Sequence, residues 1–206
     1  MRKMKKLLLL LTIILISCSS KETEVDNIEF MAYNWNLETP INKEKPKFKI
    51  DCEIYSIINP NGENKTYTSH YEPNRIEKYF ESKIDEKNIE SLIYSFDKLA
   101  KESKSQIKYD SNIGCISSPP ILKVKINYKD KSSKSYYYNF TENSKDYSTI
   151  ISLYKNLRMT EIEENYRKVN MNTELTNKKA EFINYIMKAD TLSFTKPKKI
   201  NFEPQG

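Results

Sequence analysis

The sequence predicts an α+β domain, built on an antiparallel sheet of about four to five strands from two hairpins, with helices packed on one face. Two observations carry this prediction. Two stretches alternate apolar and polar residues, and a turn signal follows each of them. After each hairpin, apolar residues recur every three or four positions, which is typical of a helix that buries one side.

The first hairpin is expected to follow an apolar and aromatic strand over residues 28–37. Asn61-Gly62 is the strongest short hairpin signal, and its partner strand is expected over residues 65–71. Alternation before the turn places five residues on one strand face, so that Cys52 points to the core. These five are Phe48, Ile50, Cys52, Ile54 and Ile58.

The first helix is the clearest element of the sequence. Asp85 stands where an N-cap is expected, because its carboxylate can accept hydrogen bonds from the first free amides of the helix. Six apolar residues then share one helical face while Lys and Glu occupy the other. They are Ile89, Leu92, Ile93, Phe96, Leu99 and Ala100.

The second hairpin is expected over residues 122–140, with a polar turn at residues 129–134. Lys123 and Lys125 are expected to face outward. The return strand contains Tyr136-Tyr137-Tyr138, interpreted as alternate tyrosines half-buried against their neighbours. The residues expected to face inward are Leu122, Val124, Ile126 and Tyr128.

Two more helices are expected near residues 147–157 and 175–187, with a charged segment around Glu161 to Lys168 between them. Within it, Glu161 to Glu164 is interpreted as a solvated face. The chain without its signal peptide has the ordinary size of one domain, so residues 28–195 are interpreted as a single domain. Residues 196–206, with two prolines, are expected to form a loose C-terminal tail.

The N-terminus is built like an export signal. Four basic residues precede an apolar run from Leu7 to Ile16, and no further charge follows until Lys21. This run is shorter than the about 20 residues that a transmembrane helix needs. Residues 1–17 are therefore expected to be a signal peptide.

Leu15-Ile16-Ser17-Cys18 resembles the lipobox of bacterial lipoproteins, which signal peptidase II cleaves. The resemblance implies cleavage before Cys18, with diacylglycerol on its thiol and an acyl chain such as palmitate on its new amino group. Two lipid chains together are enough to hold a protein stably on a membrane. The composition and Ser17 resemble lipoproteins of Bacteroidota, which implies the outer membrane, at its periplasmic face or at the cell surface. Residues 18–27 are then a flexible tether.

The basic balance of the chain is mostly a property of the signal peptide. The formal charge is +6, from 34 basic and 28 acidic residues. Without Arg2, Lys3, Lys5 and Lys6 it falls to +2, and the remaining Lys and Glu are interspersed. Nucleic-acid binding needs clustered positive charge, so no nucleic-acid partner is expected.

Cys52 and Cys115 are left as a pair once Cys18 is assigned to lipid. Outside the cytoplasm disulfides persist, so a Cys52–Cys115 bridge is favoured over two buried thiols. The bridge would close a long loop. By restricting the conformational entropy of the unfolded chain, it would stabilise the fold by roughly 4 kcal/mol at most.

Residues that would mark a reaction are scarce. Three glycines cannot assemble a Walker loop or a dinucleotide fingerprint, and His70 is the only histidine. No catalytic, cofactor-binding or metal-ligating residue is assigned, and no cofactor is expected. The leading hypothesis is an envelope binding module for a protein or envelope ligand. A small carboxylate-based hydrolase and a toxin-neutralising immunity protein are the alternatives.

Overall fold

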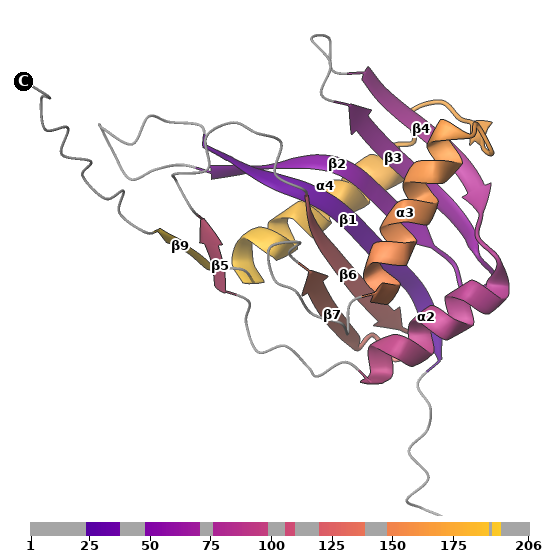
Figure 1. Ribbon diagram of the computed structural model, residues 1–206, viewed down its shortest axis with the longest axis horizontal. Helices are drawn as coiled ribbons and strands as arrows, with labels where there is room; N and C mark the ends of the chain where they lie inside the picture. Colours follow the sequence, from indigo (N-terminus) through magenta and orange to yellow (C-terminus); the bar gives the residue numbers. More distant parts are fainter. Residues whose placement is uncertain are drawn as a thin grey trace, which may run out of the picture.

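The computed structural model describes residues 24–37, 48–70, 76–98, 106–109, 120–138, 148–189 and 191–194. Within these ranges the protein is α+β, as predicted, with three helices and a seven-stranded antiparallel sheet (Figure 1). None of the described helices is both long and apolar enough to cross a membrane. Residues 1–17, expected to be a signal peptide, Cys18, Cys115 and residues 196–206, expected to be a loose tail, lie outside the described residues.

The sheet has the order β7-β6-β1-β2-β3-β4-β8, and every neighbouring pair is antiparallel. The short strands β5 and β9 pair separately and in parallel. The strands are β1 (Val25–Leu37), β2 (Phe48–Ile58), β3 (Glu63–His70), β4 (Ile76–Lys83), β5 (Gln106–Tyr109), β6 (Ile121–Tyr128), β7 (Ser133–Tyr138), β8 (Arg167–Lys168) and β9 (Thr191–Phe194).

The prediction of four to five strands was too low because β4 and β8 carry weak signals. In β4 the two buried residues, Tyr79 and Phe80, are adjacent rather than alternating, and charged residues surround them. β8 is two residues long, and it pairs with Phe80 and Glu81. The first strand also begins at Val25, inside the segment expected to be tether.

The three helices are α2 (Glu86–Lys98), α3 (Ser148–Ile162) and α4 (Thr173–Ala189). α2 and α3 pack in one apolar cluster with Phe30 of β1, whereas α4 packs in a second cluster with Met31. Successive residues of a strand point to opposite faces, so the helices cover both faces and not the single face expected. Figure 1 shows α3 and α4 on opposite sides of the strands.

A β-bulge in β2 divides the apolar set that alternation predicts on one face. Ala32 pairs with Ile54 and Tyr33 pairs with Cys52, so Glu53 is an extra residue. Cys52 therefore packs on the α4 side and Ile54 on the α2–α3 side. Cys52 is buried, as predicted, but in a different part of the core from Ile54.

The face of β6 that was expected to point outward is partly buried, and the expectation is wrong for Lys123. This lysine is only 4 % exposed and lies on the α4 side of the sheet. Its ammonium lies 5.7 Å from the ring centroid of Tyr137 and 5.9 Å from that of Tyr185 on α4. Aromatic faces attract cations, and the aliphatic stem of a lysine packs well against rings.

Local signals at turns and helix ends are confirmed. The carboxylate of Asp85 accepts a hydrogen bond from the amide of Lys87 at 2.9 Å, as an N-cap does. The turn between β2 and β3 contains Asn61-Gly62, with Gly62 at a φ of 84°. In β7, Tyr136 and Tyr138 are buried and Tyr137 is half-buried, as the alternation predicts.

Candidate functional site

A groove of about 790 Å³ runs between α4 and one end of the sheet. Residues from the start of β1, the β2–β3 and β6–β7 turns and the strand ends beside those turns line one side, and residues 174–185 of α4 line the other. These strand ends meet because Ile28 pairs with Ile58 and Val25 with Tyr128. We call this hollow the α4 groove.

Glu29 of β1 is one of the lining residues of the α4 groove, and it is only 8 % exposed. One carboxylate oxygen accepts a hydrogen bond of 2.8 Å from the hydroxyl of Tyr55. The other accepts one of 2.8 Å from the amide of Asn127 and lies 3.5 Å from the ammonium of Lys125. A buried carboxylate needs such partners, so this polar cluster fixes the base of the groove.

The same cluster controls the ionisation of Tyr55. Burial raises the pKa of the Tyr55 phenol well above its ordinary value, and the neighbouring Glu29 carboxylate raises it further. The phenol is therefore neutral and acts as a hydrogen-bond donor to Glu29. The hydrogen bond from Tyr55 therefore holds the Glu29 carboxylate in place.

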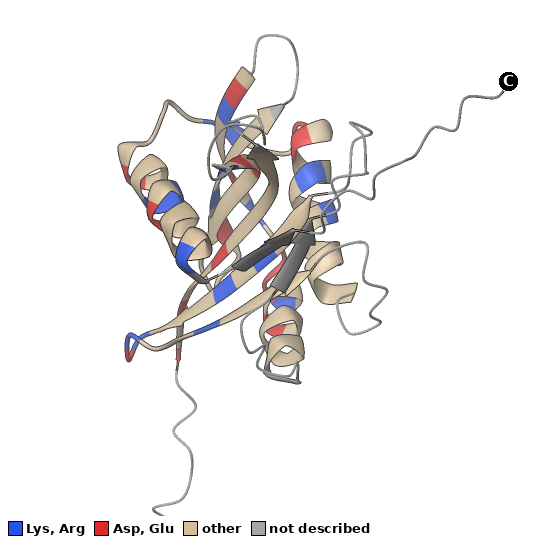
Figure 2. Cartoon of the chain, turned by 90° about the vertical axis from the view of Figure 1, so that its left-hand side faces the viewer, with Lys and Arg blue, Asp and Glu red and all other residues tan. Residues whose placement is uncertain are grey.

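The charges that line the α4 groove balance. Four lysines and four carboxylates contribute: Lys125, Lys129, Lys131 and Lys178 against Asp26, Glu29, Glu174 and Glu181. Figure 2 shows the same mixture over the described elements, with basic and acidic residues interspersed and not gathered by sign. The groove therefore suits a ligand that carries both signs or neither.

The described chain enters the domain at the rim of this groove. The carbonyl of Glu24 accepts a hydrogen bond of 2.9 Å from the amide of Lys129 in the β6–β7 turn. The ammonium of Lys129 also pairs with the carboxylate of Glu24. Because Lys129 lines the groove, Glu24, the first residue that the structure describes, lies beside the groove.

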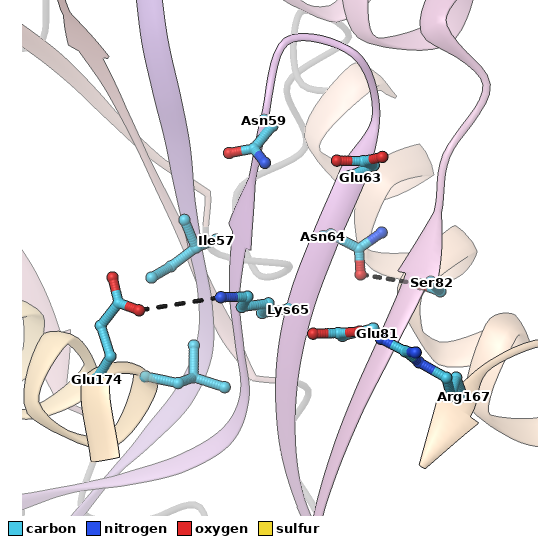
Figure 3. A pocket seen from close by; sticks show the side chains of 10 residues that line it. Ile57, Asn59, Glu63, Asn64, Lys65, Glu81, Ser82, Arg167 and Glu174 are labelled. Atoms are coloured by element: carbon cyan, nitrogen blue, oxygen red, sulfur yellow. Dashed lines mark hydrogen bonds and ion pairs between the residues drawn. The ribbon is translucent and has the colours of Figure 1, made fainter. Parts of the chain in front are cut away.

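A smaller hollow of about 430 Å³ lies over strands β2, β3 and β4, next to the start of α4 (Figure 3). Lys65 and Glu174 pair at 3.9 Å across it, and Arg167 pairs with Glu81. Asn64 accepts a hydrogen bond of 2.8 Å from Ser82. Four of its five charged side chains, all except Glu63, are thus paired with one another, which leaves fewer of them for a ligand.

The residues singled out by sequence do not gather in either hollow. Cys52 lies in the core on the α4 side, while Cys18 and Cys115 lie outside the described residues, so the disulfide remains a prediction. His70 ends β3, and its side chain is also outside what the structure describes. Within the described ranges, no three His, Cys, Asp or Glu residues come together as a metal site would require.

Three carboxylates are strongly buried, and they lie apart: Glu29 in the groove, Asp51 in β2 and Glu161 at the end of α3. Asp51 accepts a hydrogen bond of 3.2 Å from Asn36. Glu161 pairs at 3.1 Å with Lys78, so the expectation of a solvated face from Glu161 to Glu164 is wrong at Glu161. No described pair of buried acids faces one cleft, as a two-carboxylate hydrolase requires.

Sequence reasoning missed Glu29, Tyr55 and Asn127. One signal for Glu29 was present, because a single carboxylate stands between Ile28 and Phe30 in an otherwise apolar run. A buried charge has to be paired, so such a residue indicates partners on neighbouring strands. Nothing in the sequence says which strands these are.

Compared with known protein families, curated proteins and solved structures, this chain matches none of them.

Proposed function

We propose that this chain is an envelope lipoprotein, anchored through lipid on Cys18, whose folded domain is a binding module with the α4 groove as its binding surface. The anchor rests on the lipobox Leu15-Ile16-Ser17-Cys18. The binding role rests chiefly on one observation. The groove combines a rigid, buried polar base at Glu29 with a rim of exposed charges.

The position of the groove supports the same proposal. Ligand sites are concave and place a few polar groups on a rigid scaffold. Here the scaffold is the interior strands β1 and β6, which are paired on both sides. The rim includes Lys178 and Glu181 of α4, and neither has an ion-pair partner among the described residues.

The anchor is tested by metabolic labelling with a palmitate analogue. The wild-type chain is expected to carry the label, and Cys18→Ala is expected to lose it and leave the membrane fraction. Labelling that survives the substitution would end the lipoprotein proposal.

The binding role is tested by cross-linking on native membranes, with matched variants. Lys178→Glu reverses a charge in the groove, and Lys155→Glu makes the same change on an exposed position of α3, on the opposite side of the sheet. The groove partner, whether a protein or another envelope ligand such as a lipid, is expected to be cross-linked by wild type and Lys155→Glu and lost in Lys178→Glu. A cross-linking pattern that Lys178→Glu leaves intact contradicts the assignment of the groove.

A further inference from the structure

The α4 groove lies within a short distance of the proposed lipid anchor. Six residue steps separate Cys18 from Glu24, which spans about 20 Å at full extension. Glu24 is held against Lys129 at the groove rim, and Asp26 and Asn27 line the groove itself. On the proposed function, the rim of the groove therefore stays within about 20 Å of the lipidated Cys18, close enough to reach the membrane surface.

The charges at the rim select the chemistry of a ligand at that surface. Lys131 and Lys178 are positively charged and have no ion-pair partner among the described residues. Glu181 is negatively charged and likewise has no ion-pair partner among them. A purely anionic head group would be repelled by the acidic residues, and a purely cationic one would be repelled by the lysines. A zwitterion with phosphate at one end and ammonium at the other satisfies both signs.

The groove suits a ligand with a primary ammonium better than one with a quaternary ammonium. A quaternary ammonium donates no hydrogen bond and relies on open aromatic faces. The ring of Tyr185 in the groove is already covered, by the ammonium of Lys125 at 5.1 Å and by the ring of Phe182 at 5.8 Å. Carboxylates such as Glu181 instead favour an ammonium that donates.

We propose that the α4 groove binds the zwitterionic head group of a phosphoethanolamine lipid in the membrane that carries the anchor. The phosphate is bound by the lysines of the rim, Lys131 and Lys178, and the ammonium by the carboxylate of Glu181. This inference rests on the proposed function for its placement at the membrane. It adds the ligand that the groove takes there.

The test uses the mature chain, residues 18–206, with Cys18→Ala, so that vesicle binding reports the groove and not the lipid. Flotation is compared on vesicles of phosphatidylcholine alone and on the same vesicles with added phosphatidylethanolamine or phosphatidylglycerol. Binding is expected to rise with phosphatidylethanolamine. No rise with phosphatidylethanolamine, or an equal or larger rise with phosphatidylglycerol, would overturn the proposal.

Two charge reversals separate this proposal from simple attraction between lysines and a membrane. Lys178→Glu and Glu181→Lys are each expected to weaken binding to phosphatidylethanolamine vesicles about threefold, while the α3 control Lys155→Glu is not. Stronger binding by Glu181→Lys would show a basic patch instead and refute the zwitterion. Because the chain is unlipidated, failure here leaves the palmitate result, and with it the anchor, untouched.

Discussion

The hydroxyl of Tyr55 donates a hydrogen bond of 2.8 Å to the carboxylate of Glu29, from β2 to the neighbouring strand β1. Both residues lie on the α4 side of the sheet, under the helix that forms one wall of the groove. The packing of α4 and the shape of the groove therefore depend on the same buried contact.

Tyr55→Phe is expected to lower the free energy of unfolding by about 1.5–3 kcal/mol, since a buried carboxylate loses one of its donors. Urea denaturation measures this change. Tyr94→Phe, at a position of α2 that is 64 % exposed, is the control and is expected to change stability by less than about 0.5 kcal/mol. Equal effects of the two substitutions would mean that the Glu29 contact contributes nothing.

Alkaline pH is expected to destabilise the domain. Burial raises the pKa of Tyr55, of Tyr67 and of Tyr154 above the ordinary value in the folded state. The folded protein thus keeps protons that the unfolded chain loses above a pH of about 10. The unfolding free energy should be constant from pH 8 to 9 and fall above 10, as urea titrations at each pH would show. The unfolding free energy of Tyr55→Phe should fall less steeply with pH than that of the wild type. An identical slope would contradict the role of Tyr55 in this pH dependence.

The pair between Lys78 and Glu161 joins β4 to α3. The Glu161 side chain is only 4 % exposed, so Lys78→Met leaves a buried carboxylate without its ammonium. This substitution is expected to cost about 2 kcal/mol or more, and the double variant Lys78→Met with Glu161→Leu should recover most of it. Thermal and urea unfolding measure both. Lys83→Met, at the exposed end of β4, is the control and should have little effect.

Gly62 is required by its surroundings as well as by its φ. A side-chain carbon there would lie 1.9 Å from the carbonyl oxygen of Ile84. Gly62→Ala is expected to lower the unfolding free energy by about 2 kcal/mol or more, because the strained turn must also move away. Glu164 has a φ of 55° in an exposed position, and Glu164→Gly should change stability by less than about 1 kcal/mol. A tolerated Gly62→Ala would show that the turn relaxes freely.

The proposed bridge between Cys52 and Cys115 is checked by mass spectrometry under non-reducing conditions. The two peptides that contain these cysteines are expected to appear joined in protein recovered from the envelope. Alkylation of both thiols without reductant would refute the bridge. Cys52 is only 4 % exposed, so this alkylation must be carried out in denaturant.

Local signals in the sequence predicted local structure well. The α2 helix follows from Asp85 and its apolar stripe, and the β2–β3 turn follows from Asn61-Gly62. The bulge at Glu53 could not be predicted, because the alternation runs without interruption from Phe48 to Ile54, across the bulge itself, and gives no sign of an extra residue. Its carboxylate instead accepts hydrogen bonds from Tyr154 at 3.2 Å and Arg158 at 3.1 Å on α3, contacts made about 100 positions away in the sequence.

The groove was less accessible to sequence reasoning than the fold. Glu29, Tyr55 and Asn127 come from three strands, and their contact depends on the register of β1 against both β2 and β6. Register follows from pairing between distant strands, which a single sequence does not reveal. α4 was predicted as a helix from its apolar stripe, but its place on the opposite face depends on β1 being apolar on both sides.

The attachment of the entering chain to β1 has a mechanical consequence. β1 is an interior strand, hydrogen-bonded to β2 along one side and to β6 along the other. In an antiparallel sheet these bonds lie perpendicular to the strand. Tension on a lipidated Cys18 would pull along β1 and load both ladders in shear, so that many bonds share the force at once. A domain held in this way should resist extraction forces that would peel off a strand at the edge of the sheet.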